Sequence, residues 1–431
     1  MDVTIHRGSK EIGGSCVEVS AGGTRLILDA GMPLVDEDRE PFDTRATRGR
    51  SIDELIAAKV VPDVPGLFGD GPRPDAILLS HSHIDHAGLL HLTHGSIPIH
   101  ATKGASQMML AGELFAKQER LKQVRHREVV PDTPFSIGVF RVTPYAVDHS
   151  TYGCVAYLLE ADGKTLLYSG DLRWHGRKPE MIENLISRVA KRNIDAILME
   201  GTHVGSGRGK GRNEYELEEE IQTAMRGARG LVLASFSPQD VDRLITYTNA
   251  ARDAGRIFVA DAYTAFVMHL LGKDPSVPTL GVTEHIRVYL NAYFLQKRNM
   301  GTVDDRINKA RIELEEILAT PERFVMVFRP SMTEPDFGGR LPEGCRCIYS
   351  AWRGYLEKPD WVECQRKVAE AGGDFLPRHT SGHIYEEDLV ELVTRINPKR
   401  VIPIHTFEPE GFCRHFPNAT PLRDGERSPI S

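Results

Sequence analysis

Short apolar runs bounded by glycine or polar residues recur through the first 200 residues and predict paired β-strands. Residues 16–20 (CVEVS) and 24–29 (TRLILD) flank a glycine pair, so they predict a hairpin. Residues 153–171 predict a second hairpin, which turns at Asp162-Gly163. Further strands are predicted at 75–80, 97–101, 140–147 and 195–200, and a helix is predicted at 103–124.

After residue 200 the pattern changes to alternating helical and apolar segments. Helices are predicted at 214–227 and 239–254, with helical segments continuing to about residue 318; strands are predicted at 230–236, 256–262, 323–328 and 347–352. This alternation predicts a parallel sheet covered by helices. The last part of the chain again resembles the first 200 residues. It predicts a strand and loop at 373–383, an amphipathic helix at 385–396 and a strand at 399–406.

Composition and charge narrow the class of protein. A chain of 431 residues is long enough for two or three domains. Neither a signal peptide nor a membrane-spanning run is visible, and the six cysteines lack a disulfide-framework spacing, so we expect a cytoplasmic protein with reduced thiols. The net charge of −7 counts mildly against nucleic-acid binding. Two basic stretches, 205–212 and 117–127, are each explained by a solvated loop or helix face.

Histidines and carboxylates gather where the predicted strands end, and loops at strand ends are where a rigid sheet can present ligands. These residues are Asp29, His81, His149, Asp171, Glu200, His383 and His405. A random scatter of polar residues would not sort in this way.

The stretch "HSHIDH" after the apolar run 75–80 predicts a metal site. His81 and His83 can face one centre, and Asp85 and His86 can face another. His149 can complete the first site, His405 the second, and the Asp171 carboxylate can bridge both. Two metals roughly 3.5–4 Å apart can clamp the attacking and leaving oxygens of a phosphodiester. Three other histidines, His91, His94 and His100, fit ordinary core or surface positions.

With these residues in place, the chain resembles the metallo-β-lactamase superfamily, whose hallmark is HxHxDH, and within it the β-CASP nucleases of the ribonuclease J type. Glu200 ends the strand before the region where that family carries its insertion, and residues 379–406 resemble its returning segment. The resemblance implies an αββα sandwich with an inserted β-CASP α/β domain. We therefore expect a metallo-β-lactamase domain at 1–203 and 376–431, interrupted by a β-CASP domain at 204–375.

The resemblance also implies roles for individual residues. His81, His83, His149 and Asp171 would hold one zinc ion; Asp85, His86, Asp171 and His405 would hold the other, with manganese as an alternative metal. Asp29 would orient the ligands. His383 would protonate the leaving oxygen, Glu200 would position it, and Asp85 could also accept a proton. A histidine at position 405 is typical of the RNA-cleaving branches.

The loop His379-Thr380-Ser381-Gly382 offers backbone N–H groups and hydroxyls to an anion. In ribonuclease J-like enzymes this loop holds a substrate phosphate, so we expect it to favour 5′-monophosphate ends, with help from Ser235. The other interpretation is an ordinary polar turn. The chain departs from the family at Gly201 and His203, where the usual motif reads E-S-T-Y-G, and at Thr406-Phe407, where Gly-Glu is usual.

Three hypotheses follow. The first is a two-zinc ribonuclease that cleaves single-stranded RNA as a 5′→3′ exonuclease, an endonuclease or both, with a homodimer as a compatible assembly and no membrane partner. The second is a metallo-hydrolase of DNA, a nucleotide or a small ester, which the acidic net charge and the altered acid motif leave open. The third is a non-catalytic subunit of an RNA-processing complex. Inactive relatives lose ligands, whereas every catalytic position is present here, so the third ranks last.

Overall fold

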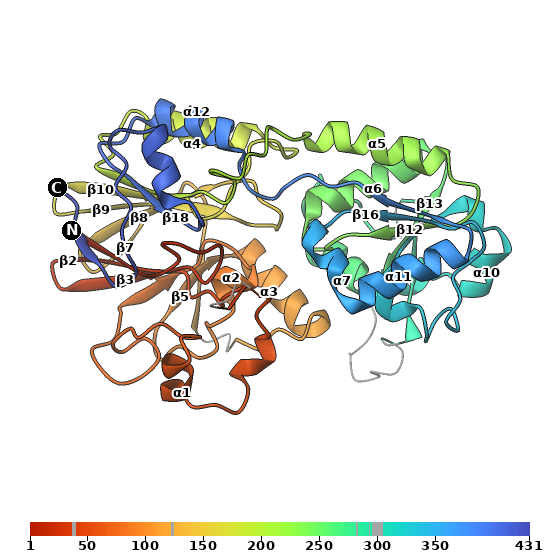
Figure 1. Cartoon of the computed structure of the whole chain (residues 1–431), viewed down its shortest axis with the longest axis horizontal. Coiled ribbons are helices and arrows are strands. Elements are labelled where there is room, and N and C mark those ends of the chain that lie inside the picture. The colour runs from red at the N-terminus through yellow and green to blue at the C-terminus, as the bar shows by residue number, and fades with distance from the viewer. Residues whose placement is uncertain (37–39, 122–124, 282, 293, 295–304) are drawn as a thin grey trace. The chain divides into compact units, whose positions relative to one another are not determined.

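The computed structural model describes residues 1–36, 40–121, 125–281, 283–292, 294 and 305–431. Its backbone contacts divide the chain into two compact units (Figure 1). The first unit comprises residues 1–174, 178–211 and 382–431, and the second comprises residues 175–177 and 212–381. The second unit is therefore inserted into the sequence of the first, and the chain crosses between them several residues after positions 203 and 375.

Two β-sheets form the centre of the first unit. The first sheet has the order β19-β1-β2-β3-β4-β5-β6, and the second has the order β18-β11-β10-β9-β8-β7. The strands of the first are β1 (Asp2–Arg7), β2 (Cys16–Ala21), β3 (Thr24–Leu28), β4 (Ala76–Leu78), β5 (Ile99–Thr102), β6 (His126–Val129) and β19 (Arg427–Pro429). Those of the second are β7 (Phe135–Ile137), β8 (Phe140–Ala146), β9 (Val155–Ala161), β10 (Lys164–Tyr168), β11 (Ala196–Glu200) and β18 (Val401–Ile404). Both predicted hairpins are confirmed as β2–β3 and β9–β10.

Strand periodicity sorts the apolar side chains between the sheets and their outer faces. Val17 and Val19 of β2 and Leu159 of β9 are fully buried in the core between the two sheets. Ile27 of β3 belongs to the outer face of the first sheet, and Leu158 of β9 to the outer face of the second. Removing these side chains from water is the main stabilising term of the sandwich.

Helices cover both outer faces of this sandwich. On the second sheet lie α4 (Glu180–Val189) and α12 (Glu386–Ile396), and on the side of the first sheet lie α1 (Ile52–Ala57), α2 (Ile84–Ala87) and α3 (Lys103–Phe115) (Figure 1). A 3-10 turn, η1 (Thr44–Thr47), precedes α1. The helix–sheet–sheet–helix layering confirms the predicted fold class. Helix α4 was not predicted, although Ile182, Leu185 and Val189 form a buried face at helical spacing.

The predicted helix at 103–124 is too long. Helix α3 ends at Phe115, Lys117 has a positive φ of 56°, and residues 122–124 lie outside the described residues. The Gln118 backbone N–H donates to the Gly112 carbonyl at 3.2 Å, so the chain folds back on the last turn of the helix. The first half of the basic stretch at 117–127 is therefore a turn and not the solvated face of a helix.

The second unit is built on a six-stranded, fully parallel sheet, as the alternating pattern predicted. Its order is β14-β13-β15-β12-β16-β17. The strands are β12 (Val232–Ser235), β13 (Ile257–Asp261), β14 (Ile286–Tyr289), β15 (Phe324–Val327), β16 (Arg346–Tyr349) and β17 (Asp374–Pro377). The helices are α5 (Glu214–Arg226), α6 (Val241–Asp253), α7 (Ala262–Leu270), α9 (Asp305–Lys309), α10 (Leu314–Ala319) and α11 (Pro359–Glu370), and short 3-10 turns also occur. Part of the helical content predicted up to residue 318, at 293 and 295–304, lies outside the described residues.

One face of this sheet packs on α11, where Leu233 and Cys347, paired in register, lie in one apolar cluster with Cys364 and Val368 of the helix. Among the described residues, no helix is both long and apolar enough to cross a lipid bilayer.

Candidate metal centre

The structure brings together histidines and carboxylates that follow the ends of strands in the first unit. His81 and His83 follow β4, and the single turn of α2 then carries Asp85 and His86. Four further strands supply the remainder: His149 follows β8, Asp171 follows β10, Glu200 ends β11 and His405 follows β18. His383 precedes α12. The seven predicted metal ligands, together with Glu200 and His383, form three groups, and within each group the ligand atoms lie within 4.8 Å of one another. The second and third groups share Asp171 and His405.

The first group consists of three imidazoles, those of His81, His83 and His149. His149 Nε2 lies 3.1 Å from His83 Nδ1. Asp171 Oδ2 lies 3.8 Å from the Nε2 atoms of both His81 and His149. Three nitrogens and one carboxylate oxygen are a donor set that zinc prefers.

The second group includes the same carboxylate, that of Asp171. Asp171 Oδ2 lies 3.1 Å from His86 Nε2 and 3.7 Å from His405 Nε2. Asp85 Oδ2 lies 3.2 Å from His405 Nε2. Asp171 Oδ2 thus lies within 4 Å of imidazole nitrogens from both groups.

The polar atoms of this cluster fit divalent cations. His81 Nε2, His86 Nε2 and both Asp171 carboxylate oxygens are buried and form no hydrogen bond within the described part of the chain. Burying such atoms without a partner is unfavourable, and here they converge on one another. Burial lowers the pKa of His81 and His149 well below the usual value, which keeps both imidazoles neutral and able to bind a metal. The residues present therefore fit a pair of metal ions.

Asp29 supports this cluster from behind. Burial lowers the pKa of His86, but the carboxylates of Asp171 and Asp29 outweigh burial and raise it well above the usual value. Asp29 Oδ2 lies 2.7 Å from His86 Nδ1, and it also accepts hydrogen bonds from Ser80 Oγ at 2.7 Å and Tyr168 OH at 2.6 Å. Asp29 is held at a positive φ of 61°. Ser80 and Tyr168 were not predicted as site residues, although Ser80 directly precedes His81 and Tyr168 lies three residues before Asp171.

Hydrogen bonds at the far ring nitrogens orient three ligands. His149 Nδ1 donates to the Gly382 carbonyl at 2.5 Å, which leaves Nε2 for a metal. Ser80 Oγ lies 3.0 Å from His81 Nδ1, and Thr202 Oγ1 lies 3.0 Å from His405 Nδ1. Such partners fix the tautomer and the ring orientation of a metal ligand.

Glu200 and His383 form a pair beside the centre. Glu200 is buried and accepts backbone N–H groups from Leu172 at 3.1 Å and Thr202 at 3.3 Å. His383 Nδ1 lies 3.2 Å from Glu200 Oε2 and 3.7 Å from Asp171 Oδ2. Burial lowers the pKa of His383, but the carboxylates of Glu200 and Asp171 outweigh burial and raise the pKa to about 9. Its side chain is 21% exposed, so this imidazole can carry a proton to a molecule in solution.

Comparisons with known proteins agree with this geometry. The beta-lactamase superfamily domain matches residues 52–225. A ribonuclease J from Mycolicibacterium smegmatis is 25% identical over 430 residues, covering 96% of this chain and 69% of the relative. A ribonuclease J from Methanocaldococcus jannaschii is 23% identical over 432 residues, covering 94% and 91%. The crystal structure of a protein of unknown function from Enterococcus faecalis V583 superposes with a TM-score of 0.81 at 20% identity, covering 99% of both chains.

These matches support assignment of the chain to the metallo-β-lactamase superfamily. Within it, the chain is similar to ribonuclease J along nearly its whole length, and this similarity supports the β-CASP assignment.

Packing explains one departure from the superfamily's ribonuclease J-like pattern. Where that pattern has serine, this chain has Gly201, and a Cβ at this position would meet Phe412 Cε2 at 2.4 Å. The fully buried Phe412 ring fills the space that the serine side chain would need. Two residues on, His203 stacks on Tyr385 with ring centroids 5.2 Å apart. Thr202, which the sequence analysis did not single out, contacts both His383 and His405.

The HTSGH loop is divided between the units. Gly382 and His383 lie with the metal centre, whereas His379, Thr380 and Ser381 belong to the second unit. There the Thr380 hydroxyl donates to the Arg212 carbonyl at 2.6 Å, and His175 Nε2 donates to the Ser381 carbonyl at 2.8 Å. Ser235 ends β12 in the second unit. The phosphate-binding role of Ser235 and of this loop stays a prediction.

The basic loop 205–212 is tied to its surroundings. Lys210 Nζ forms a 2.6 Å ion pair with Asp388 of α12, and this hydrogen bond raises the pKa of the lysine. Arg212 pairs with Glu220. Both cations are engaged within the protein, so the loop offers less free charge than its sequence suggested.

Proposed function

We propose that this protein is a metal-dependent ribonuclease that hydrolyses RNA phosphodiester bonds with two zinc ions, or two manganese ions, per chain. The observation that carries the proposal is the convergence of six predicted ligands on the seventh, Asp171. Both Asp171 carboxylate oxygens and the Nε2 atoms of His81 and His86 are buried without a hydrogen bond to the described residues. The relatives named ribonuclease J support RNA as the substrate.

His81, His83 and His149 would hold one ion, Asp85, His86 and His405 the other, and Asp171 would contact both. Two such cations supply an activated water and neutralise charge on the phosphate. The remaining steps belong to the protein. Asp85, 3.2 Å from His405 Nε2, can accept a proton at the edge of the centre.

His383 would protonate the leaving oxygen. Glu200 lies beside its Nδ1 atom and stabilises the protonated ring. Two backbone N–H groups fix the orientation of the Glu200 carboxylate, and the Thr202 hydroxyl lies 3.1 Å from the same His383 nitrogen. This arrangement orients a partly exposed acid toward the ligand cluster, as general acid catalysis requires.

We propose that the substrate is single-stranded RNA with a 5′-monophosphate. The protein would degrade it as a 5′→3′ exonuclease, cleave it internally as an endonuclease, or do both. The loop from His379 to Gly382, with Ser235, would bind the terminal phosphate through backbone N–H groups and hydroxyls. The Thr380 hydroxyl already donates its hydrogen bond to the Arg212 carbonyl. The backbone N–H groups and Ser381 would therefore make most of the contacts to the phosphate.

The test is a cleavage assay with zinc- or manganese-loaded protein. The substrates are a 3′-labelled single-stranded RNA with a 5′-monophosphate, the same RNA with a 5′-hydroxyl, and the matching DNA. The variants are His83→Ala, His383→Ala and, as a matched control, His94→Ala. His94 lies outside the ligand groups, where its Nδ1 contacts Ser96.

RNA cleavage that is lost in the first two variants and retained in His94→Ala supports the proposal, and a preference for monophosphate ends supports the role of the 379–382 loop. Cleavage of DNA alone would transfer the activity to the hydrolase hypothesis. A protein that binds two metals but cleaves none of the three substrates contradicts the proposal.

A further inference from the structure

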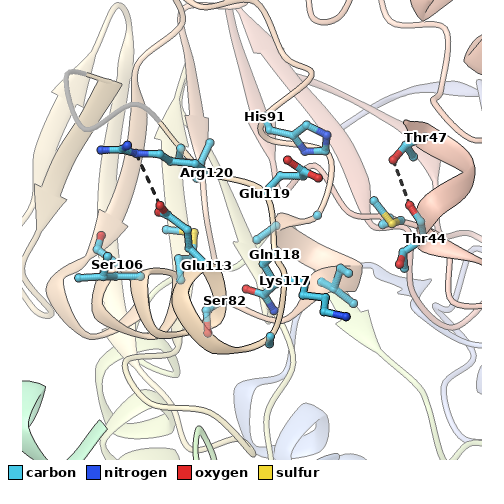
Figure 2. A pocket seen from close by; sticks show the side chains of 18 of the residues that line it. Thr44, Thr47, Ser82, His91, Ser106, Glu113, Lys117, Gln118, Glu119 and Arg120 are labelled. Atoms are coloured by element: carbon cyan, nitrogen blue, oxygen red, sulfur yellow. Dashed lines mark hydrogen bonds and ion pairs between the residues drawn. The ribbon is translucent and has the colours of Figure 1, made fainter. Parts of the chain in front are cut away.

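A cavity of about 770 Å³ lies beside the metal-binding loop, with all its lining residues in the first unit (Figure 2). Ser82, which stands between His81 and His83 in the sequence, contributes to its wall, as do Ile84 and Ala87 of α2. Another part of the lining comes from α3 and from residues 116–121, which include the start of the basic stretch 117–127. The volume falls within the range of roughly 300–1,000 Å³ that is typical of ligand sites.

Five cations and four carboxylates, those of Asp43, Glu113, Glu119 and Glu128, line this cavity, and two of the cations are lysines outside any ion pair among the described residues. Of its five lining cations, Arg45, Arg48 and Arg120 pair with acidic neighbours, at 2.9, 3.5 and 3.6 Å. Lys103 and Lys117 are exposed and form no ion pair with any described residue. A lysine that is not neutralised from within the protein can bind a phosphate.

The backbone holds Lys117 in an unfavourable conformation. Its φ of +56° is rare for a residue with a side chain and is usually adopted by glycine. Gln118 packs against the last turn of α3, where a Cβ at Gly112 would meet Gln118 Oε1 at 1.9 Å. Strained backbone of this kind is often found at ligand sites.

The lining offers contacts to a base as well as to a phosphate. Met32, Met109 and Leu121 contribute apolar surface, and Gln107 and Gln118 contribute amide groups. Apolar surface with a few polar groups is what a nucleobase requires from a site.

We propose that this cavity binds a segment of the single-stranded RNA substrate that lies outside the cleaved bond. The inference rests on the proposed ribonuclease function and adds a second contact region in the same unit as the metals. Lys103 begins α3, and Lys117 follows its end. A 13-residue helix is roughly 20 Å long at 1.5 Å per residue. One phosphate group cannot bridge that distance, so the spacing favours a strand over a mononucleotide.

The test measures binding separately from cleavage. Zinc-loaded protein carrying His383→Gln, which slows cleavage, is titrated against a 3′-fluorescein-labelled 12-nucleotide RNA, and anisotropy is followed at several salt concentrations. Lys103→Ala/Lys117→Ala is compared with Lys191→Ala. Lys191 is an exposed lysine that follows α4 on the second sheet, away from the cavity. Wild-type protein is assayed for cleavage alongside.

The double variant is expected to bind RNA about tenfold more weakly. Its plot of log affinity against log salt should become less steep by about 1.4, because each lost phosphate contact on a single strand removes about 0.7. Lys191→Ala should match the His383→Gln parent. Lys117→Gly should raise the melting temperature by relieving the positive φ and still lose affinity, which separates binding from folding.

Equal affinity and salt slope in the double variant and its parent, with wild-type cleavage intact, would overturn the cavity assignment and leave the ribonuclease function standing. Retained affinity in Lys117→Gly would overturn it as well. Full competition by uridine monophosphate, lost in the double variant, would assign the cavity to a mononucleotide and overturn the strand. A wild-type protein that neither binds nor cleaves RNA would overturn both proposals.

Discussion

Asp29 Oδ2 lies 2.7 Å from Nδ1 of His86, on the side of the imidazole ring that faces away from Asp171. The contact orients His86 Nε2 toward the ligand cluster and strengthens its basicity. We expect Asp29→Asn to weaken zinc binding about 10–100-fold. The neutral amide would accept a weaker hydrogen bond from His86 Nδ1 than the charged carboxylate does, so it would orient the ring less firmly. Zinc content after dialysis against graded chelator concentrations measures the change.

Asp162→Asn is the matched control for this substitution. Asp162 also has a positive φ, 51°, but it lies in the exposed turn between β9 and β10. Asparagine tolerates this backbone conformation at both positions. Equal chelator resistance in Asp29→Asn and Asp162→Asn would show that the Asp29 carboxylate does not support the metal centre.

The positions of the ligands could be anticipated because local pattern determined them. The apolar run at 75–80 contains a strand, β4. The residues that follow such a strand, here His81 and His83, lie at the edge of the sheet. The same reasoning placed Asp171 and His405 after β10 and β18. The spacing of apolar residues that predicts a strand is a short-range signal, so a single sequence carries it.

Other features depend on contacts that are distant in sequence. The Phe412 ring that excludes a side chain at Gly201 lies 211 residues away, so nothing near Gly201 indicates it. The helical pattern at 103–124 continues past Phe115, whereas the chain turns there through the positive φ of Lys117. Helix boundaries depend on such tertiary context more than on propensity.

Glu200 and His383 should act in catalysis without holding the metals. We expect His383→Gln to lower kcat about 10²–10⁴-fold, which is the usual contribution of general acid catalysis, with two metal ions still bound. Glu200→Gln should lower kcat in the same direction, because the amide no longer stabilises the protonated imidazole. Single-turnover cleavage rates together with metal content measure both effects. A parallel loss of metal in His383→Gln would instead make His383 a ligand.

Restoring the family residue at position 201 should destabilise this protein. We expect Gly201→Ser to lower the free energy of unfolding by roughly 1–3 kcal/mol, since its Cβ would overlap the Phe412 ring. Phe412→Leu should relieve the overlap, so the double variant should be less destabilised than the sum of the two single changes. Denaturant unfolding of the four proteins gives the coupling energy.

Gly209→Ser serves as the control, because no atom lies within 4 Å of a Cβ at that position. It should leave the unfolding midpoint unchanged. Additive effects of Gly201→Ser and Phe412→Leu would show that Phe412 is not the reason for glycine at 201.

Stability at low pH should depend on Glu18 of β2. Its side chain is 14% exposed, and its carboxylate accepts hydrogen bonds from Arg25 at 2.7 and 3.0 Å and lies 3.3 Å from His6 Nε2. Burial raises the pKa of Glu18, but the hydrogen bonds from His6 and Arg25 outweigh burial and lower it to about 2. A carboxylate whose pKa is lower in the folded state contributes stability above its unfolded pKa, and that contribution is lost as the pH falls through the folded pKa.

We therefore expect Glu18→Gln to lower the free energy of unfolding at pH 7 by roughly 1–2 kcal/mol, after allowance for solvent screening. The difference from wild type should shrink between about pH 4.5 and pH 2, where the native carboxylate becomes protonated. Urea midpoints at pH 7, 5 and 3.5 follow this convergence. Glu363→Gln, which removes a carboxylate from an exposed pair with Arg366, should leave the midpoint unchanged at each pH. A deficit in Glu18→Gln that stays constant down to pH 3 would assign its effect to packing and not to charge.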